Sequence, residues 1–159
     1  MSSNFANDMD AGRRVSGSAV ERLVAASEYP GEVPAGARTH VLQVDGGEVF
    51  AEETGGRIRL SRKLTAEPSE WAGLASCAPG RMLKEEATLA VGPVPGEAEG
   101  KPACFLWQDA AAGADAHGLR RLLETFLDSY DWWRARTAAG RSAGDSADLP
   151  AQAETIIRP

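Results

Sequence analysis

The residues of this chain that could act as nucleophiles, bases or metal ligands are few and scattered. The histidines are His40 and His117, and the cysteines are Cys77 and Cys104. Neither histidine has a carboxylate or a cysteine at the spacing of metal ligands, and a structural zinc site needs several such ligands with short-spaced pairs among them. We therefore expect no metal site. Both cysteines lie in apolar sequence without a CxxC pair, and we expect small buried side chains rather than a disulfide.

The acidic residues and the glycines do not form a recognisable catalytic arrangement either. Glu85 and Glu86 are adjacent, so on a strand their side chains would point to opposite faces. The stretch DGGEVFAEE lacks the alternating oxygen ligands of a calcium loop, and a hairpin turn explains it more simply. The chain contains no GxxxxGK[ST] or GxGxxG sequence, and no GxSxG elbow follows a predicted strand. The sequence argues against an enzyme and predicts no cofactor.

The composition is that of a globular domain with an acidic balance. The 159 residues are 43% hydrophobic, and 17 Lys and Arg against 23 Asp and Glu give a formal net charge of -6. An acidic chain repels phosphate, so neither nucleic acid nor an anionic membrane is expected as a partner. No run has the apolar length of a signal peptide core or a membrane span. We expect a bacterial cytoplasmic protein that inserts into no membrane.

Hydrophobic periodicity predicts the first half of the fold. A short helix begins after Ser18, a plausible N-cap, and Glu21 completes a capping box. Three runs rich in Val, Ile, Phe and Thr then follow within residues 39–64, separated by paired glycines that suit tight turns. They predict an antiparallel meander. In the third run, Ile58 and Leu60 alternate with polar residues, which predicts one buried face and one face in water. Those polar residues are Arg57, Arg59 and Ser61.

The second half predicts a helix, two strands and a helix. The short helix carries Trp71 and Leu74 and ends before Pro79. The two strands lie around residues 86–92 and 102–109, joined by the Gly- and Pro-rich stretch PVPGEAEGK, which we expect to be an exposed loop. With the first half, the order is helix, three strands, helix, two strands, helix. This order indicates an α+β fold in which one antiparallel sheet packs against helices.

The last helix has the strongest pattern in the chain. It is expected to begin after Asp115 and to fade by Ala139, with apolar residues at the spacing of one helical face. These residues are Leu119, Leu122, Leu123, Phe126, Tyr130 and Trp133. Trp132 and Trp133 lie about 100° apart on such a helix. Both could straddle the edge of the sheet, or one could contribute to an interface with a partner.

The domain is expected to span residues 17–139. Residues 1–16 and 140–159 are polar or small and lack periodicity, which predicts a flexible tail at each end.

The order of elements, the small acidic chain and the long amphipathic last helix resemble the Tir-chaperone (CesT-like) family, the class I chaperones of bacterial type III secretion. The resemblance spans about residues 18–137. It is carried by GRMLKEEATLAVGP, PACFLWQDA and LRRLLETFLDSYDWWRAR. The family's pattern consists of apolar positions rather than fixed chemical groups.

This resemblance implies a homodimer that binds the N-terminal region of secreted effector proteins. The effector segment would be largely extended, would add a strand to a sheet edge, and would place apolar side chains in shallow pockets. No cofactor is implied, and a separate secretion ATPase would release the effector. The effector-binding residues implied are Leu23, Val24, Val41, Val44 and Val49, and the dimer contacts are Trp71, Leu74, Leu89 and Val91. Ordinary core packing is the alternative for each of them.

Two other readings stay open from the sequence. A non-catalytic regulatory or binding module of similar arrangement, such as the YbjN-like fold, would share the order of elements. The second alternative is an enzyme whose active site leaves no recognisable sequence pattern. Exposed apolar patches on a dimer would favour a chaperone, and a deep polar cleft would favour chemistry.

Overall fold

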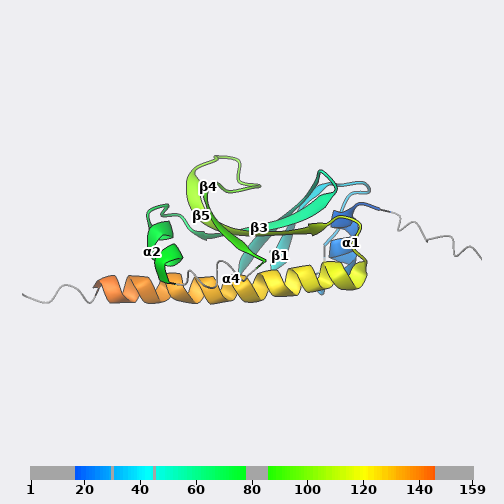
Figure 1. Cartoon of the computed structure of the whole chain (residues 1–159). Coiled ribbons are helices and arrows are strands. Elements are labelled where there is room, and N and C mark those ends of the chain that lie inside the picture. Colours follow the sequence, from blue (N-terminus) through cyan, green and yellow to red (C-terminus); the bar gives the residue numbers. More distant parts are fainter. Residues whose placement is uncertain (1–16, 30, 45, 78–85, 146–159) are drawn as a thin grey trace, which may run out of the picture.

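The computed structural model describes residues 17–29, 31–44, 46–77 and 86–145. It shows the predicted α+β fold, with one antiparallel five-stranded sheet and helices packed against it. The long helix α4 (Ala116–Asp145) runs along the sheet, with α1 (Ala19–Ala26) near its N-terminal end and α2 (Glu70–Cys77) near its C-terminal half (Figure 1). The expected tail at 1–16 lies outside the described residues, as do residues 146–159 of the tail expected at 140–159.

Helix α1 begins as the sequence predicts. The Ser18 side chain accepts a hydrogen bond from the Glu21 backbone N–H (3.1 Å), and the Glu21 carboxylate accepts one from the Ser18 backbone N–H. This capping box satisfies N–H groups that have no partner inside the helix. The Ser18 hydroxyl also donates to the Ala37 carbonyl (2.6 Å), which ties the start of α1 to the segment before the sheet. Because the hydrogen bond from the Ser18 backbone N–H stabilises the ionised carboxylate, the pKa of Glu21 lies below its usual value.

The first three strands form the predicted meander. They are β1 (Thr39–Val44), β2 (Gly47–Thr54) and β3 (Arg57–Thr65), each antiparallel to the next. The turn between β2 and β3 uses Gly55 and Gly56 at φ +56° and +75°, a region that glycine enters without steric cost.

The last two strands complete the sheet. They are β4 (Thr88–Pro93) and β5 (Pro102–Ala111), and β5 pairs with both β3 and β4. The resulting strand order is β1-β2-β3-β5-β4. Strands β1 and β4 are therefore the two edges of the sheet in the part of the chain that the structure describes.

The core lies between the sheet, α1 and α4. All six residues of the predicted stripe on α4 are buried, and they pack with the inward residues of α1 and the strands. Arg22 ties α1 to the segment before α4 by donating to the carbonyls of Ala112 and Ala114. An ion pair between Arg120 and Glu28 (2.7 Å) joins the start of α4 to the segment after α1.

Three local expectations differ from the structure. Helix α4 continues beyond Ala139 to Asp145, although this last stretch includes Gly140 and Gly144, and glycine disfavours helix. Ser61 of β3 is buried rather than in water. The stretch between β4 and β5 is not wholly exposed, because it folds back over the sheet and buries Val94. This returning loop also covers Ser61, which explains the second difference.

Candidate binding surfaces

The predicted effector-binding residues divide between the core and the surface. Leu23 and Val49 are fully buried, and Val24 and Val44 are nearly so. Val41, on the edge strand β1, is 38% exposed. The division follows from strand geometry, because Val44 and Val49 point to the face covered by α4 whereas Val41 points to the other face, here called the outer face. Of the five residues, Val41 is the one with substantial surface to offer a partner.

Phe50 extends this outer apolar surface, and the sequence reasoning did not single it out. It lies directly opposite Val41 in the β1–β2 register and is half-buried. Its neighbours Val49 and Ala51 are buried on the helix-covered face. The signal was present in the sequence, because strict alternation around two inward residues places the intervening phenylalanine outward.

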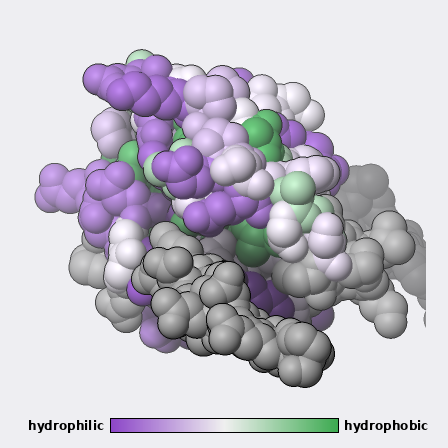
Figure 2. Space-filling model, turned by 90° about the vertical axis from the view of Figure 1, so that its left-hand side faces the viewer, coloured by the Kyte–Doolittle hydropathy of each residue, from purple (hydrophilic) through white to green (hydrophobic). Residues whose placement is uncertain are grey.

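The predicted dimer contacts divide in the same way. Trp71 on α2 is 38% exposed and Val91 on the edge strand β4 is 45% exposed, whereas Leu74 and Leu89 are buried. Helix α2 contacts β4, so the two exposed residues belong to neighbouring elements. Viewed from the α2 end of the molecule, the apolar residues form small separate patches in a largely hydrophilic surface (Figure 2).

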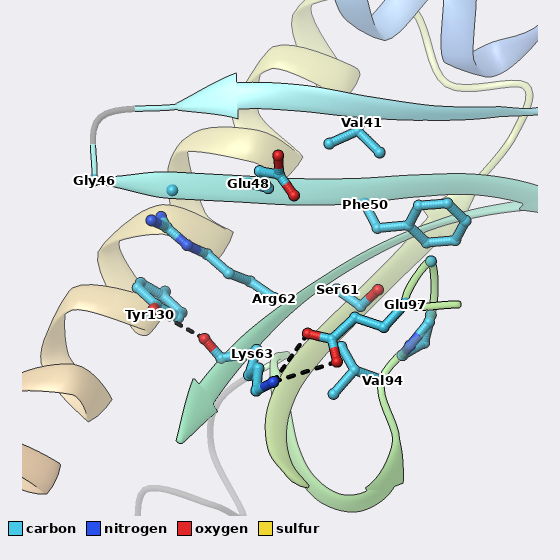
Figure 3. Close-up of a pocket in the computed structure, with 13 residues that line it drawn as sticks. Val41, Gly46, Glu48, Phe50, Ser61, Arg62, Lys63, Val94, Glu97 and Tyr130 are labelled. Atoms are coloured by element: carbon cyan, nitrogen blue, oxygen red, sulfur yellow. Dashed lines mark hydrogen bonds and ion pairs between the residues drawn. The ribbon is translucent and has the colours of Figure 1, made fainter. Parts of the chain in front are cut away.

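The loop between β4 and β5 encloses a cavity on the outer face. The cavity of about 250 Å³ lies between this loop and strands β1–β3 (Figure 3). Gly96, at φ +85°, lies so close to Phe50 that a Cβ there would stand 2.6 Å from the ring. An ion pair between Lys63 and Glu97 (3.1 Å) holds the same part of the loop. The loop is thus fixed to the sheet at two points.

The rest of the outer face carries charged and aromatic side chains. Arg57 donates two hydrogen bonds to Asp109 across the β3–β5 pair (2.8 and 2.9 Å). The guanidinium of Arg59 lies 4.5 Å from the centre of the Trp107 ring, a cation–π contact. The hydrogen bonds and charge of Arg57 lower the pKa of Asp109. The charged side chains on this part of the face therefore already have partners within the chain.

The tryptophans near the end of α4 have different environments. Trp133 is buried in the core, whereas Trp132 is half-buried and packs against the core. Their rings meet edge to face with centres 5.0 Å apart, and Arg136 covers the Trp132 ring at 3.2 Å. Much of the Trp132 surface is therefore already in contact with this chain.

The residues considered for chemistry lie apart from one another. His40 lies on β1 and His117 at the start of α4. Cys104 is a buried free thiol whose pKa is raised by burial, and the side chain of Cys77 lies outside the described residues. Glu86 accepts a hydrogen bond from Gln108 (3.2 Å), and Glu85 lies outside the described residues.

A search of the described residues finds no cluster of three or more His, Cys, Asp or Glu side chains that could hold a metal ion. No helix in the described ranges combines the length and the apolar character needed to cross a membrane. No protein-family model matches the chain, and a search of curated proteins finds no significant match.

Proposed function

We propose that this protein is a bacterial cytoplasmic chaperone of type III secretion, a homodimer that binds the N-terminal region of secreted effector proteins and keeps it partly extended. It acts by binding, without a catalytic group or cofactor of its own. Release of the effector is the task of a separate secretion ATPase.

The placement of the exposed apolar side chains carries this proposal. Among the described residues, three large hydrophobic side chains are well exposed: Val41, Trp71 and Val91. Val41 lies on the surface expected to bind the effector, and Trp71 and Val91 lie on the surface expected to form the dimer. In a dimer, the exposed side chains of Trp71 and Val91, on neighbouring elements, would be covered together by the second chain.

The edge strand β1 supports the mode of binding. Among the described strands it pairs only with β2, so its other side is available to a further strand. A partner in extended form could add its backbone to this edge and place apolar side chains near Val41 and Phe50. Main-chain pairing of this kind depends little on the partner's sequence, which suits a chaperone that serves several effectors.

Co-expression with secreted proteins of the same bacterium tests the proposal. We expect the full chain to co-purify with an effector's N-terminal region, as two chaperones to one effector by light scattering. Val41→Asn should weaken capture at least tenfold, because it removes the exposed apolar group from β1. Thr39→Asn is the matched control, since Thr39 lies on the same strand and face and is polar already.

Two results would contradict the proposal. The first is a chain that captures none of the secreted proteins of its bacterium, which would favour a regulatory module of similar fold. The second is an equal loss of capture in the Val41 and Thr39 variants, which would show that apolar contact at β1 does not matter.

A further inference from the structure

The buried polar side chains of the described residues separate into two groups. Thr65, Gln108 and Thr137 each have a hydrogen-bond partner. Ser61 and Arg62 are 2% and 5% exposed, yet Ser61 Oγ and Arg62 Nη2 have none. Buried polar atoms are nearly always paired, so an unpaired one calls for an explanation. These two residues are neighbours on β3, so their side chains point to opposite faces of the sheet. Both line the cavity beneath the β4–β5 loop, Ser61 from the outer face and Arg62 at the end beside Tyr130 of α4.

Glycines in the β1–β2 turn give Arg62 its place at one end of the cavity. A Cβ on Gly47 would stand 2.8 Å from Arg62 Nη2, so a larger residue would displace the guanidinium. The Tyr130 ring covers the guanidinium at 4.0 Å, which leaves its N–H edge as the donor. Arg134 reaches the same turn, with Nη1 3.4 Å from a Cβ placed on Gly46. Neither arginine has an ion pair within the described part of the chain.

Of the other charged groups around the cavity, two form an ion pair with each other and the third is hydrogen-bonded to a neutral amide. Lys63 pairs with Glu97, and Glu48 accepts a hydrogen bond from Gln43 (3.0 Å). The remaining wall is apolar and includes Val41 and Phe50 (Figure 3). The cavity thus has an apolar wall, the unpaired hydroxyl of Ser61 and the unpaired guanidinium of Arg62. These features suit a ligand with an anionic group at the end of an apolar chain.

We propose that this cavity binds an acidic side chain of the extended partner segment, with Arg62 pairing with the carboxylate and Ser61 donating to a second acceptor of the same segment. This inference rests on the proposed function, because it names the chemistry that the chaperone recognises beside β1. An acidic residue flanked by apolar residues is the motif expected in that segment.

Matched small probes test the site in the full chain. The first pair is 4-methylpentanoate and 4-methylpentanamide, and the second is acetyl-Val-Glu-Val-amide and acetyl-Val-Gln-Val-amide. We expect the carboxylate and the Glu peptide to shift the backbone amide NMR signals of Ser61, Arg62 and Gly47 and to saturate. The neutral partners should bind at least tenfold more weakly. If the free carboxylate binds and the Glu peptide does not, the ligand is not a peptide side chain and the proposal is overturned. If neither probe binds, the cavity is not a carboxylate site.

Variants locate the binding. Arg62→Gln should lower the affinity for the Glu peptide at least tenfold. Arg121→Gln, at an exposed arginine of α4, should leave this affinity unchanged. If Arg62→Gln does not fold, Ser61→Ala serves instead, with an expected weakening of several fold. Asp45 adjoins the same turn in the sequence but lies outside the described residues. If Asp45→Asn binds the probes and the natural chain does not, the chain supplies its own carboxylate and the inference is overturned.

The inference and the proposed function can fail separately. If Arg62→Gln and Ser61→Ala capture an effector with unchanged affinity, the carboxylate site is overturned and the proposed chaperone function is not. Failure of the natural chain to capture any secreted protein would overturn the chaperone, whatever the probes show.

Discussion

The two faces of the sheet are built differently. The helix-covered face packs apolar side chains against α1 and α4, and its largest residues, Phe126 and Trp133, are buried. The outer face carries ion pairs, a cation–π contact and a cavity under the β4–β5 loop. Its apolar residue Val41 remains exposed. The first face supplies the core, and the partner-binding surfaces that we propose lie on the second face and at the sheet edges.

The largest expected change in the free energy of unfolding distinguishes a variant on the helix-covered face from one on the outer face. Phe126→Ala should lower the free energy of unfolding by about 3–5 kcal/mol, because it leaves a cavity in the core. Val41→Ala on the outer face should change it by about 0.5 kcal/mol or less. Urea unfolding of both variants measures the difference. Equal losses in the two variants would mean that the outer face is also part of the stabilising core.

The next effect concerns the attachment of the β4–β5 loop. Gly96→Ala should cost about 2–3 kcal/mol, because it combines a positive φ with a clash against Phe50. Gly100→Ala is the matched control, since Gly100 also has a positive φ but has no atom within 4 Å of the added Cβ. It should cost about 1 kcal/mol. If both variants lose the same free energy in urea unfolding, the contact with Phe50 does not hold the loop.

A smaller effect is expected at the start of α1. Ser18→Ala should lower the free energy of unfolding by about 1 kcal/mol, because it removes the capping hydrogen bond to the Glu21 backbone. Ser76→Ala, at an exposed hydroxyl on α2 that bonds only its own helix, is the control and should change little. A Ser18 variant as stable as the natural chain would contradict the capping interpretation.

The smallest effect comes from the ion pair on the outer face. Asp109→Asn should lower the free energy of unfolding by about 0.5 kcal/mol at pH 7, since Arg57 is more than half exposed. The folded-state pKa of Asp109 is lowered, so this contribution is present above the unfolded pKa of about 4 and is lost as the pH falls through the folded-state pKa.

The natural chain and Asp109→Asn should therefore converge in stability once the pH falls below the folded-state pKa of Asp109, as chemical unfolding across pH can measure. Glu99→Gln, in an ion pair that is almost fully exposed, should have no effect at any pH. A difference between the natural chain and Asp109→Asn that persists unchanged at low pH would contradict the role of the ion pair.

Local patterns were sufficient to predict the elements. The capping box at Ser18, the glycine turns and the apolar stripe of α4 are encoded within a few residues of one another, and the structure confirms them. Short-range signals of this kind determine where an element begins, which face it buries and where the chain turns.

Contacts between distant residues could not be predicted in this way. The burial of Ser61 depends on a loop more than thirty residues later, and the unpaired Arg62 is visible only once Gly47 and Tyr130 are placed around it. Four of the five residues assigned to the effector surface are buried, because the family resemblance indicates regions rather than the direction of each side chain.

The solution mass of the chain tests the central claim most directly. Light scattering at micromolar concentration should give twice the mass of one chain, and Val91→Asp should give a monomer, because it places a charge in the apolar contact at β4. Thr88→Asp, at an exposed position on the opposite face of the same strand, should remain a dimer. A natural chain that is monomeric, or a Val91 variant that stays dimeric, would contradict the assignment of the exposed α2–β4 residues to an interface.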